Sequence, residues 1–303
     1  MDHLDRIQKT RDWLNTQIIG QEHLVDRILI ALLSDGHLLV EGAPGLAKTK
    51  AIKTLSEAII GEFQRIQFTP DLLPSDITGT EIYRTQDGSF QFQEGPVFHN
   101  LILADEINRA PAKVQSALLE AMAERTVSVG NRTLKLPKLF LVMATQNPIE
   151  QEGTYSLPEA QLDRFLMKVK IDYPDSPSER EILRLVRNES VPDASQKFDD
   201  PLTESEILAA RRDILNLHMA DVVEEYIVAL TMATRNPTHY AANIANQIDF
   251  GVSPRGTIAL DLCSRTNAYI SGKDFVSPDD VQAVIHDVFR HRLILSFEAE
   301  AQE

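Results

Sequence analysis

The chain is poor in cysteine and has no long apolar run. Cys263 is its one cysteine among 303 residues, so an internal disulfide bond is excluded. Because Cys263 stands in an apolar stretch with helical pattern, we expect a buried structural thiol rather than a nucleophile. No apolar run approaches the roughly 18 residues of a membrane span, and residues 1–5 lack the basic and apolar regions of a signal peptide. We therefore expect no membrane span and a cytoplasmic location.

Positive charge is also scarce. The chain has 30 Lys and Arg against 45 Asp and Glu, which makes the formal net charge -15. Broad binding to nucleic acid or to an anionic membrane needs dense positive charge, so this balance argues against both, although a local basic channel created by assembly stays open. The eight histidines show no metal-ligand spacing, and we expect His286 and His291 to lie on helix surfaces.

The stretch at residues 41–50 has the features of a phosphate-binding loop. It follows an apolar run at 37–40 and opens a stretch able to form a helix, which is the context in which a glycine loop binds phosphate. Glycines let the backbone wrap so that its N–H groups point inward, and the helix adds its positive dipole end. The alternative is an ordinary surface turn that contains glycine. The predicted nucleotide-binding residues of the loop are Gly42, Ala43, Pro44, Gly45, Leu46, Ala47, Lys48, Thr49 and Lys50.

Two side chains of this loop carry chemistry, and one position departs from the consensus. Lys48 can reach the outer phosphates of a bound triphosphate, and the Thr49 hydroxyl can ligate the magnesium ion that accompanies them. Ala47 stands where the consensus has its last glycine. The extra methyl group is tolerable if Ala47 adopts a helical, negative φ, so the departure weakens the match to the consensus without cancelling it.

Five apolar segments are predicted to be strands of one parallel sheet. Runs such as 101–103 suit strands buried on both faces, and most of the segments are separated by helical stretches or long insertions. Helical periodicity precedes them at 5–17 and again through Leu24, Ile28 and Leu32. The five predicted strands are 37–41, 63–68, 100–105, 138–145 and 165–171. These elements predict an α/β fold.

A domain boundary is predicted near residues 172–177, where two prolines coincide with a change of pattern. Beyond it no strong strand signal occurs, and capping signals at Thr203 and Ser277 introduce helices. The predicted helices are 179–188, 203–215, 220–235, 254–271 and 278–290. We therefore predict an α/β nucleotide-binding domain at 1–174 and a smaller helical domain at 175–303.

Two insertions between the predicted strands look like β-hairpins. Residues 82–92 place an Asp87-Gly88 turn signal between β-prone arms. Residues 126–136 alternate apolar and polar side chains around a turn at Gly130-Asn131. Each hairpin either handles a substrate or decorates the surface.

The predicted strand at 100–105 ends in two acids, Asp105 and Glu106. At such a strand end Asp105 can hold a water molecule bound to the magnesium ion, and Glu106 can polarise the attacking water as a general base. An Asp-Glu pair alone is a weak signal because loops are full of acids, whereas downstream of a phosphate loop it is a strong one. The pair favours hydrolysis over phosphoryl transfer to another substrate, and the sequence has no Asn-Lys-x-Asp signal for guanine.

Five sequence strings stand out along the chain. They are GAPGLAKT at 42–49, DEINRAP at 105–111, ATQNP at 144–148, LPEAQLDRF at 157–165 and SPRG at 253–256. In this order they closely resemble the MoxR family of AAA+ ATPases, over nearly the whole chain. Ala47 is typical of that family, so the departure from the consensus supports the resemblance. The resemblance implies an AAA+ P-loop core with a five-stranded parallel sheet and two inserted β-hairpins, followed by an all-α lid domain.

The resemblance also implies catalytic roles for three further residues. Asn147 is similar to the sensor 1 residue, whose amide would orient water between the γ-phosphate and Glu106; from the residues alone it would be a turn-forming Asn before proline. Arg164 resembles the arginine finger, which reaches the nucleotide of a neighbouring subunit. Arg255 resembles sensor 2, which couples the lid to the γ-phosphate either in its own subunit or across the interface.

Two further assignments follow from position alone. Ile18, Ile19 and Gly20 are placed like the adenine-side contact of the family, where apolar side chains cover the base. Arg109 either faces a neighbouring subunit or forms a surface salt bridge, and we expect the salt bridge.

The function that the resemblance implies is ATP hydrolysis by an oligomeric chaperone that remodels or matures partner proteins, with ATP and Mg²⁺ as cofactors. The oligomer would be a hexameric ring, and its protein client would be, in some cases, a von Willebrand factor A domain protein. Both hairpins would then tend toward the central pore. Phe90 and Phe92 would be exposed contacts there, or they would pack the hairpin against its own domain.

Two other functions stay open. A nucleic-acid translocase would use Arg84, Arg132 and Lys135 on the hairpins, but Asp87 and the net charge oppose it. A slowly hydrolysing nucleotide switch would act on a partner through conformational change alone.

Overall fold

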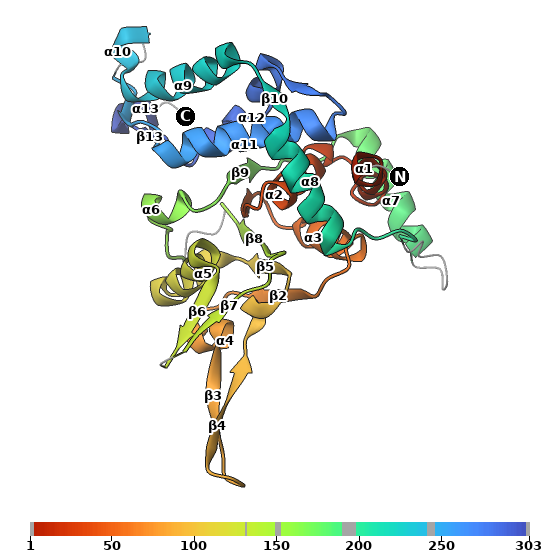
Figure 1. The fold of residues 1–303 in the computed structure, drawn as a ribbon, viewed down its shortest axis with the longest axis vertical. Coiled ribbons are helices and arrows are strands. Elements are labelled where there is room, and N and C mark those ends of the chain that lie inside the picture. The colour runs from red at the N-terminus through yellow and green to blue at the C-terminus, as the bar shows by residue number, and fades with distance from the viewer. Residues whose placement is uncertain (1–2, 131, 149–152, 190–197, 241–245, 301–303) are drawn as a thin grey trace.

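The computed structural model describes residues 3–130, 132–148, 153–189, 198–240 and 246–300. The first half of the chain forms an α/β core and the second half forms a helical lid above it (Figure 1). The elements of the core are α1 His3–Gln17, α2 Glu22–Leu33, β1 Leu38–Glu41, α3 Lys48–Glu57, β2 Phe63–Gln67, α4 Pro74–Thr78, β3 Gly79–Arg84, β4 Ser89–Glu94, η1 Pro96–Phe98, β5 Leu101–Asp105, η2 Ile107–Arg109, α5 Ala112–Glu124, β6 Thr126–Val129, β7 Arg132–Lys135, β8 Leu141–Gln146, α6 Glu159–Leu162 and β9 Met167–Lys170.

The five predicted strands form one parallel sheet in the order β2-β5-β8-β1-β9. Every neighbouring pair in this sheet is parallel. Each strand is short, and β5 is buried along its whole length. The sheet therefore confirms the predicted α/β fold, and its carboxyl-terminal edge collects the ends of β1, β5 and β8.

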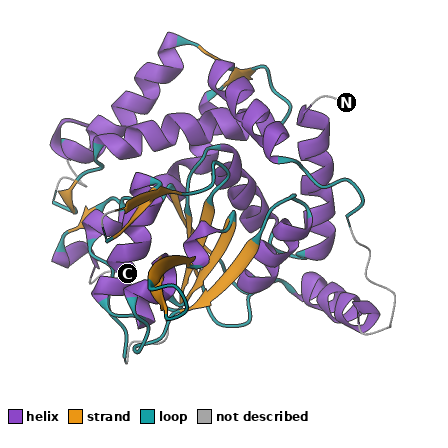
Figure 2. Ribbon diagram, turned by 60° about the horizontal axis from the view of Figure 1, so that its bottom comes forward, coloured by secondary structure: helices purple, strands orange, loops and turns teal. Residues whose placement is uncertain are grey.

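Side chains that alternate along the strands divide the interior into two apolar clusters. Leu38 and Val40 of β1 point into the cluster formed with α1, α2, α3 and the lid, whereas Leu39 points into the cluster formed with α5 and the base of the hairpins. Figure 2 shows the strands enclosed by helices. Burial of each leucine side chain stabilises the fold by about 1.5 to 3 kcal/mol, so packing on both faces stabilises the sheet.

The two predicted hairpins are present. Strands β3 and β4 pair antiparallel from Gly79↔Glu94 to Arg84↔Ser89 and project from the core as a long arm (Figure 1). Gly79 at the base has φ +93°, and a Cβ there would lie 2.3 Å from the Gln93 carbonyl oxygen. Strands β6 and β7 pair antiparallel as well, while Asn131 of the predicted turn lies outside the described residues.

Of the two predicted aromatic contacts on the first hairpin, Phe90 is exposed and Phe92 packs against its own domain. Phe90 is 62% exposed and lies against Tyr83, with ring centroids 5.2 Å apart. Phe92 packs at its edge against Phe98 of the same domain, at 5.8 Å. The outer part of the arm thus presents apolar surface, whereas its base is held by the core.

The lid is helical, as predicted, with two short strand pairs that the sequence did not indicate. Strand β10 pairs with β12, and β11 pairs with β13. Capping boxes at Thr203 and Ser277 begin α8 and α12 where the sequence placed them. The lid elements are α7 Ser176–Glu189, α8 Glu204–Asn216, β10 His218–Met219, α9 Asp221–Arg235, α10 Pro237–Tyr240, β11 Ile248–Phe250, α11 Pro254–Ile270, β12 Phe275–Val276, α12 Pro278–Phe289, β13 Ile294–Leu295 and α13 Phe297–Glu300.

The predictions about three single residues have different outcomes. Cys263 is fully buried, and burial raises the pKa of its thiol to about 12, which confirms a structural role. His286 lies exposed on α12, as predicted. The surface position predicted for His291 is wrong, because the residue is 6% exposed and its Nε2 lies 3.0 Å from the carbonyl oxygen of Phe165.

In the described part of the chain, no helix has the length and apolar character needed to cross a membrane.

Candidate nucleotide site

The loop between β1 and α3 has the tight backbone that the sequence predicted. Gly42 leaves no room for a side chain, since a Cβ would lie 2.4 Å from Cγ1 of Ile171. Gly45 has φ +86°, in the region that favours glycine. The loop therefore passes close to the end of β9 and then turns into α3.

Ala47 does not meet the condition of a helical, negative φ. Ala47 is the N-cap of α3 and has φ 58° and ψ 14°, which is left-handed. Its carbonyl oxygen already accepts the first helical bond, from the Ala51 N–H at 2.8 Å, while its own backbone still belongs to the turn. A left-handed alanine costs about 1 to 2 kcal/mol, so the packing of the loop must hold it there.

Lys48 begins α3, and its ammonium group folds back over the loop. The Nζ donates to the carbonyl oxygen of Gly42 at 2.5 Å and to that of Gln146 at 3.4 Å. Burial lowers the pKa of Lys48, and the charges of Asp105, Glu106 and Glu41 oppose that shift. The ammonium group therefore lies between the loop and the acids at the sheet edge, where outer phosphates would meet it.

Asp105 is 8% exposed, and both of its carboxylate oxygens are engaged. Thr145 Oγ1 of β8 donates to Oδ1 at 2.6 Å. Arg65 of β2 donates to Oδ2 from Nε at 3.1 Å and from Nη2 at 2.6 Å. The carboxylate is therefore held between the two strands that flank β5.

Glu106 follows directly and has a left-handed backbone, with φ 57°. Its N–H donates to Thr145 Oγ1 at 2.9 Å. Its carboxylate accepts from Gln67 Nε2 at 2.9 Å and pairs with Arg109 Nε at 3.1 Å. The second contact confirms the salt bridge expected of Arg109.

The register of the sheet explains why these side chains meet. Gln67 is paired with Asp105 across β2 and β5, and Val40 is paired with Thr145 across β1 and β8. The carboxyl ends of parallel strands lie at one edge, so residues far apart in the sequence converge there. Asn147 directly follows β8 and is 7% exposed.

Two clefts adjoin the loop. One has a volume of about 310 Å³ and is lined by Asn147 together with Glu41, Asn108, Gln146 and Pro148. The other has a volume of about 410 Å³ and lies between the loop and residues 170–173. Glu41 and Pro148 line both clefts.

The predicted adenine-side residues lie near the second cleft but differ in exposure. Ile18 is 2% exposed and belongs to the apolar core. Gly20 has φ +73° and packs against Pro174 and Ser178. The adenine contact of Ile18, Ile19 and Gly20 stays a prediction.

The two predicted arginines are not gathered at the loop of their own chain. Arg164 donates from Nη1 to the carbonyl oxygen of Leu119, on α5, at 2.7 Å. Arg255 stands at the start of α11, where it is 65% exposed and lies 3.9 Å from Asp163. A third arginine, Arg292, is buried and donates to Asp163 Oδ1 at 2.8 Å.

Four polar residues of this region were not singled out from the sequence: Arg65, Gln67, Thr145 and Arg292. Thr145 lies inside the ATQNP string, and that string was the one signal that would have found it. The other three stand at ordinary strand and loop positions, where a polar side chain needs no special explanation.

The oxygen donors near the loop suit magnesium. Thr49 supplies a hydroxyl in the first turn of α3 and Asp105 a carboxylate, and Mg²⁺ prefers such hard oxygen ligands. Among the described residues, no group of three or more His, Cys, Asp or Glu side chains is placed to hold a metal ion. One carboxylate and one hydroxyl fit an ion that binds together with substrate phosphates.

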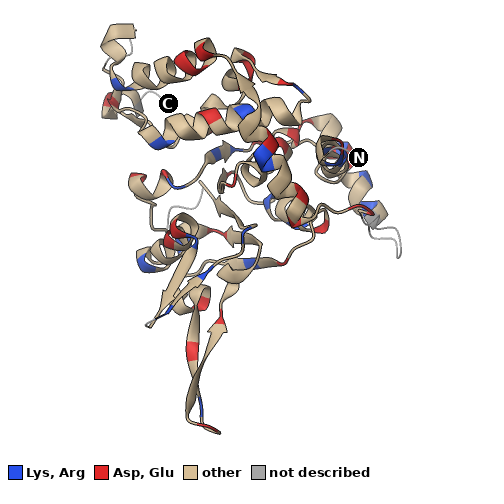
Figure 3. Ribbon diagram, in the orientation of Figure 1, with Lys and Arg blue, Asp and Glu red and all other residues tan. Residues whose placement is uncertain are grey.

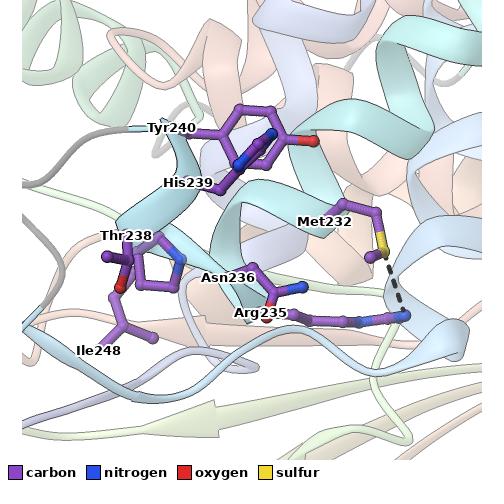
Figure 4. Close-up of a pocket in the computed structure, with 8 residues that line it drawn as sticks. Met232, Arg235, Asn236, Thr238, His239, Tyr240 and Ile248 are labelled. Carbon is purple, nitrogen blue, oxygen red and sulfur yellow. Dashed lines mark hydrogen bonds between the residues drawn. The ribbon is translucent and has the colours of Figure 1, made fainter.

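A larger hollow of about 720 Å³ lies in the lid (Figure 4). Its wall includes Arg235, His239 and Tyr240, and Arg235 is held by Met232 Sδ at 3.9 Å and by the Val252 carbonyl oxygen at 2.8 Å. It contains none of the predicted catalytic residues, so its size does not make it the candidate site.

Comparison with known proteins decides the family. Residues 37–167 match the model of the ATPase family associated with various cellular activities (AAA), and residues 240–303 match the model of the AAA lid domain. The protein named chaperone MoxR1 of Mycobacterium tuberculosis is 49% identical over 94% of this chain and 75% of its own length. The chain belongs to the MoxR-type AAA ATPases.

Other relatives of this MoxR-type AAA ATPase agree. Protein MoxR of Paracoccus denitrificans is 33% identical over 93% of the chain and 87% of its own length. The crystal structure of a candidate ATPase from Cytophaga hutchinsonii has a TM-score of 0.91 and 44% identity, and it covers 99% of this chain and 90% of its own. Family membership implies ATP binding and hydrolysis.

Proposed function

We propose that this MoxR-type ATPase works as a homo-oligomeric ring, hexameric in our proposal, that couples ATP hydrolysis to the remodelling of partner proteins. The observation that carries the proposal is the convergence of Lys48, Asp105, Glu106 and Asn147 on one sheet edge beside a glycine loop. We keep the division into residues 1–174 and 175–303 as part of the proposal.

Each residue has a distinct task in this proposal. The N–H groups of the loop and the Lys48 ammonium bind the phosphates, and Thr49 and Asp105 hold the magnesium ion. Glu106 takes the proton of the attacking water, while the Asn147 amide orients that water. When bound, magnesium neutralises charge on the outer phosphates.

The proposal gives Arg164 to the nucleotide of a neighbouring subunit. Within its own chain Nη1 donates to the Leu119 carbonyl oxygen, so this donor would have to be released if it is to reach a neighbour's phosphate. An arginine supplied in trans accelerates hydrolysis by ~10³ to 10⁵. Arg255 is exposed and would read the γ-phosphate either in its own subunit or at the seam.

Mixing two inactive variants tests this arrangement. Lys48→Ala removes the phosphate contact and Arg164→Ala removes the finger, and we expect each alone to lose steady-state ATPase activity. Mixed rings contain seams that combine an intact Lys48 with an intact Arg164, so activity should return in part. The exposed Arg212→Ala on α8 serves as the matched control and should keep wild-type activity. Absence of rescue in co-assembled rings would refute action in trans.

The proposed client is a protein, and one candidate class is a von Willebrand factor A domain protein. The exposed Phe90 on the projecting arm provides an apolar contact for such a client. Capture with Glu106→Gln held with ATP should retain a client that is released once hydrolysis is allowed. Release on ATP binding alone would indicate a nucleotide switch, and DNA-stimulated hydrolysis would indicate a nucleic-acid translocase.

Charge argues against the translocase. Arg84, Arg132 and Lys135 are exposed on the hairpins. Acidic and basic residues are nevertheless interspersed across core and lid (Figure 3), and the net charge is -15.

A further inference from the structure

The two oxygens of the Asp105 carboxylate have partners of very different kinds. Oδ1 accepts the Thr145 hydroxyl at 2.6 Å, and Oδ2 accepts two N–H groups of Arg65 at 2.6 Å and 3.1 Å. One partner is neutral and buried in the sheet, while the other carries a positive charge and reaches in from the edge strand β2.

Thr145 is a fixed partner. It is 1% exposed, its hydroxyl proton is donated to Asp105, and its oxygen accepts the N–H of Glu106 at 2.9 Å. A hydroxyl has one donor, so Thr145 cannot leave Asp105 without leaving a buried oxygen unpaired. Oδ1 is therefore held in one orientation.

Arg65 is an exchangeable partner. Its side chain is 50% exposed, and ion pairs with exposed partners are weak because water competes for both charges. Arg65 Nη2 also donates to Gln67 Oε1 at 2.9 Å, so the guanidinium keeps a hydrogen-bond acceptor when it leaves the carboxylate. The structure thus gives Arg65 a second partner one step along the same strand.

Arg65 and a magnesium ion would compete for the same carboxylate oxygen of Asp105. Both are cations, and the two N–H donors of Arg65 occupy both acceptor sites of Oδ2. A metal or its bound water can use Oδ2 only after at least one of those donors has withdrawn. Oδ1 accepts the single Thr145 hydroxyl, so Oδ2 is the oxygen whose charged partner changes in the exchange.

We propose, resting on the proposed function above, that Arg65 is a positioning residue that occupies Asp105 Oδ2 in the nucleotide-free chain and is displaced when magnesium and nucleotide bind. Arg65 thereby sets the concentration of metal that the site requires, and it keeps the buried carboxylate paired until the metal arrives. Displacement transfers one charged contact of Asp105 from the protein to the ion.

The magnesium dependence of nucleotide binding tests this proposal. Arg65→Met keeps most of the side-chain length but removes the charge, and Lys53→Met on α3 removes one positive charge at an exposed position as a matched control. Binding of a fluorescent ATP analogue is titrated with Mg²⁺, and binding of Mn²⁺ with the analogue is followed by electron paramagnetic resonance. We expect the half-saturating metal concentration of Arg65→Met to fall about fivefold, the size typical of a partly exposed ion pair.

Three comparisons separate the possible causes. In EDTA both variants should bind the analogue alike, because the exchange involves the metal alone. Arg65→Lys, which keeps the charge with a single ammonium group, should fall between wild type and Arg65→Met, and it replaces Arg65→Met if that variant does not fold. Thr145→Ser retains the hydroxyl and should keep the wild-type midpoint.

The proposed exchange would be overturned if the half-saturating metal concentration of Arg65→Met were unchanged or raised. It would also be overturned if Lys53→Met showed the same decrease. Failure of the wild-type chain to bind the analogue at any metal concentration would instead overturn the proposed function, and the exchange with it.

Discussion

The carboxyl edge of the sheet and the β3–β4 arm are built in opposite ways. At the edge, Asp105 and Asn147 are buried, and Asp105 is held from two neighbouring strands. On the arm, residues 80–91 are exposed, and the contacts among them are mostly the ladder and the Tyr83–Phe90 pair. The difference teaches that the candidate site is held by contacts from several strands, while the outer part of the arm leaves its side chains exposed to solvent.

The largest expected contrast between the two regions is in the rate of hydrolysis. Glu106→Gln removes the carboxylate that we propose as general base but keeps the size of the side chain, so turnover should fall by ~10² to 10⁴ while nucleotide binding is retained. Phe90→Ser on the arm should leave unstimulated turnover unchanged. Phosphate release and equilibrium nucleotide binding are measured for both variants. Wild-type turnover in Glu106→Gln would refute its role as base, and loss of unstimulated turnover in Phe90→Ser would remove the contrast.

Between pH 7 and pH 5, acid should destabilise the core and lid through two buried histidines, a kind of residue that the arm lacks. Burial lowers the pKa of His37 and of His291 from 6.5 to about 3. Between pH 3 and pH 6.5 both histidines are neutral in the folded chain and take up a proton when it unfolds. The free energy of unfolding is therefore highest above pH 6.5 and decreases as the pH falls from 6.5 toward 3. The arm at 79–94 contains no histidine.

Urea unfolding at pH 7 and pH 5, followed by the fluorescence of Trp13, measures this loss. The upper limit is about 1.4 kcal/mol per histidine and pH unit. His291→Gln keeps a donor for the Phe165 carbonyl oxygen but cannot titrate, so the pH dependence should become shallower. An identical pH dependence in the variant would contradict the assignment to His291.

The smallest expected contrast concerns two glycines. Gly42→Ala places a Cβ 2.4 Å from Ile171 Cγ1, and such overpacking typically costs about 1 to 3 kcal/mol. Gly88→Ala in the arm meets only the Tyr83 hydroxyl at 3.8 Å, so its cost is that of the left-handed φ of +69°, about 1 kcal/mol. Thermal unfolding of the two variants compares them. A larger loss for Gly88→Ala would show that the arm is more tightly constrained than the loop.

Much of the fold was predictable because its signals are local. Buried parallel strands read as apolar runs, as at 101–103, and Asp87-Gly88 marks a hairpin within a few residues. The loop, Lys48 and the acid pair were found for the same reason, since each motif is contiguous in the sequence.

The remaining part depends on strand order, which the sequence does not display. Arg65 and Thr145 meet Asp105 because β2 and β8 flank β5, and no local pattern specifies that neighbourhood. The left-handed φ of Ala47 was not predictable for a related reason, because whether a residue is the last of a turn or the first of a helix is decided by one position. His291 was misplaced because its burial depends on how the lid packs against Phe165.

Asp163 carries one further consequence. Its carboxylate accepts hydrogen bonds from Ser253 at 3.0 Å and from Arg292 at 2.8 Å, and Arg255 lies at longer range. A single side chain of the core is therefore in contact with three residues of the lid. The next residue in the chain is Arg164. A rotation of the lid would therefore break these contacts or carry Asp163 with it, and the residue next to Asp163 is the proposed finger.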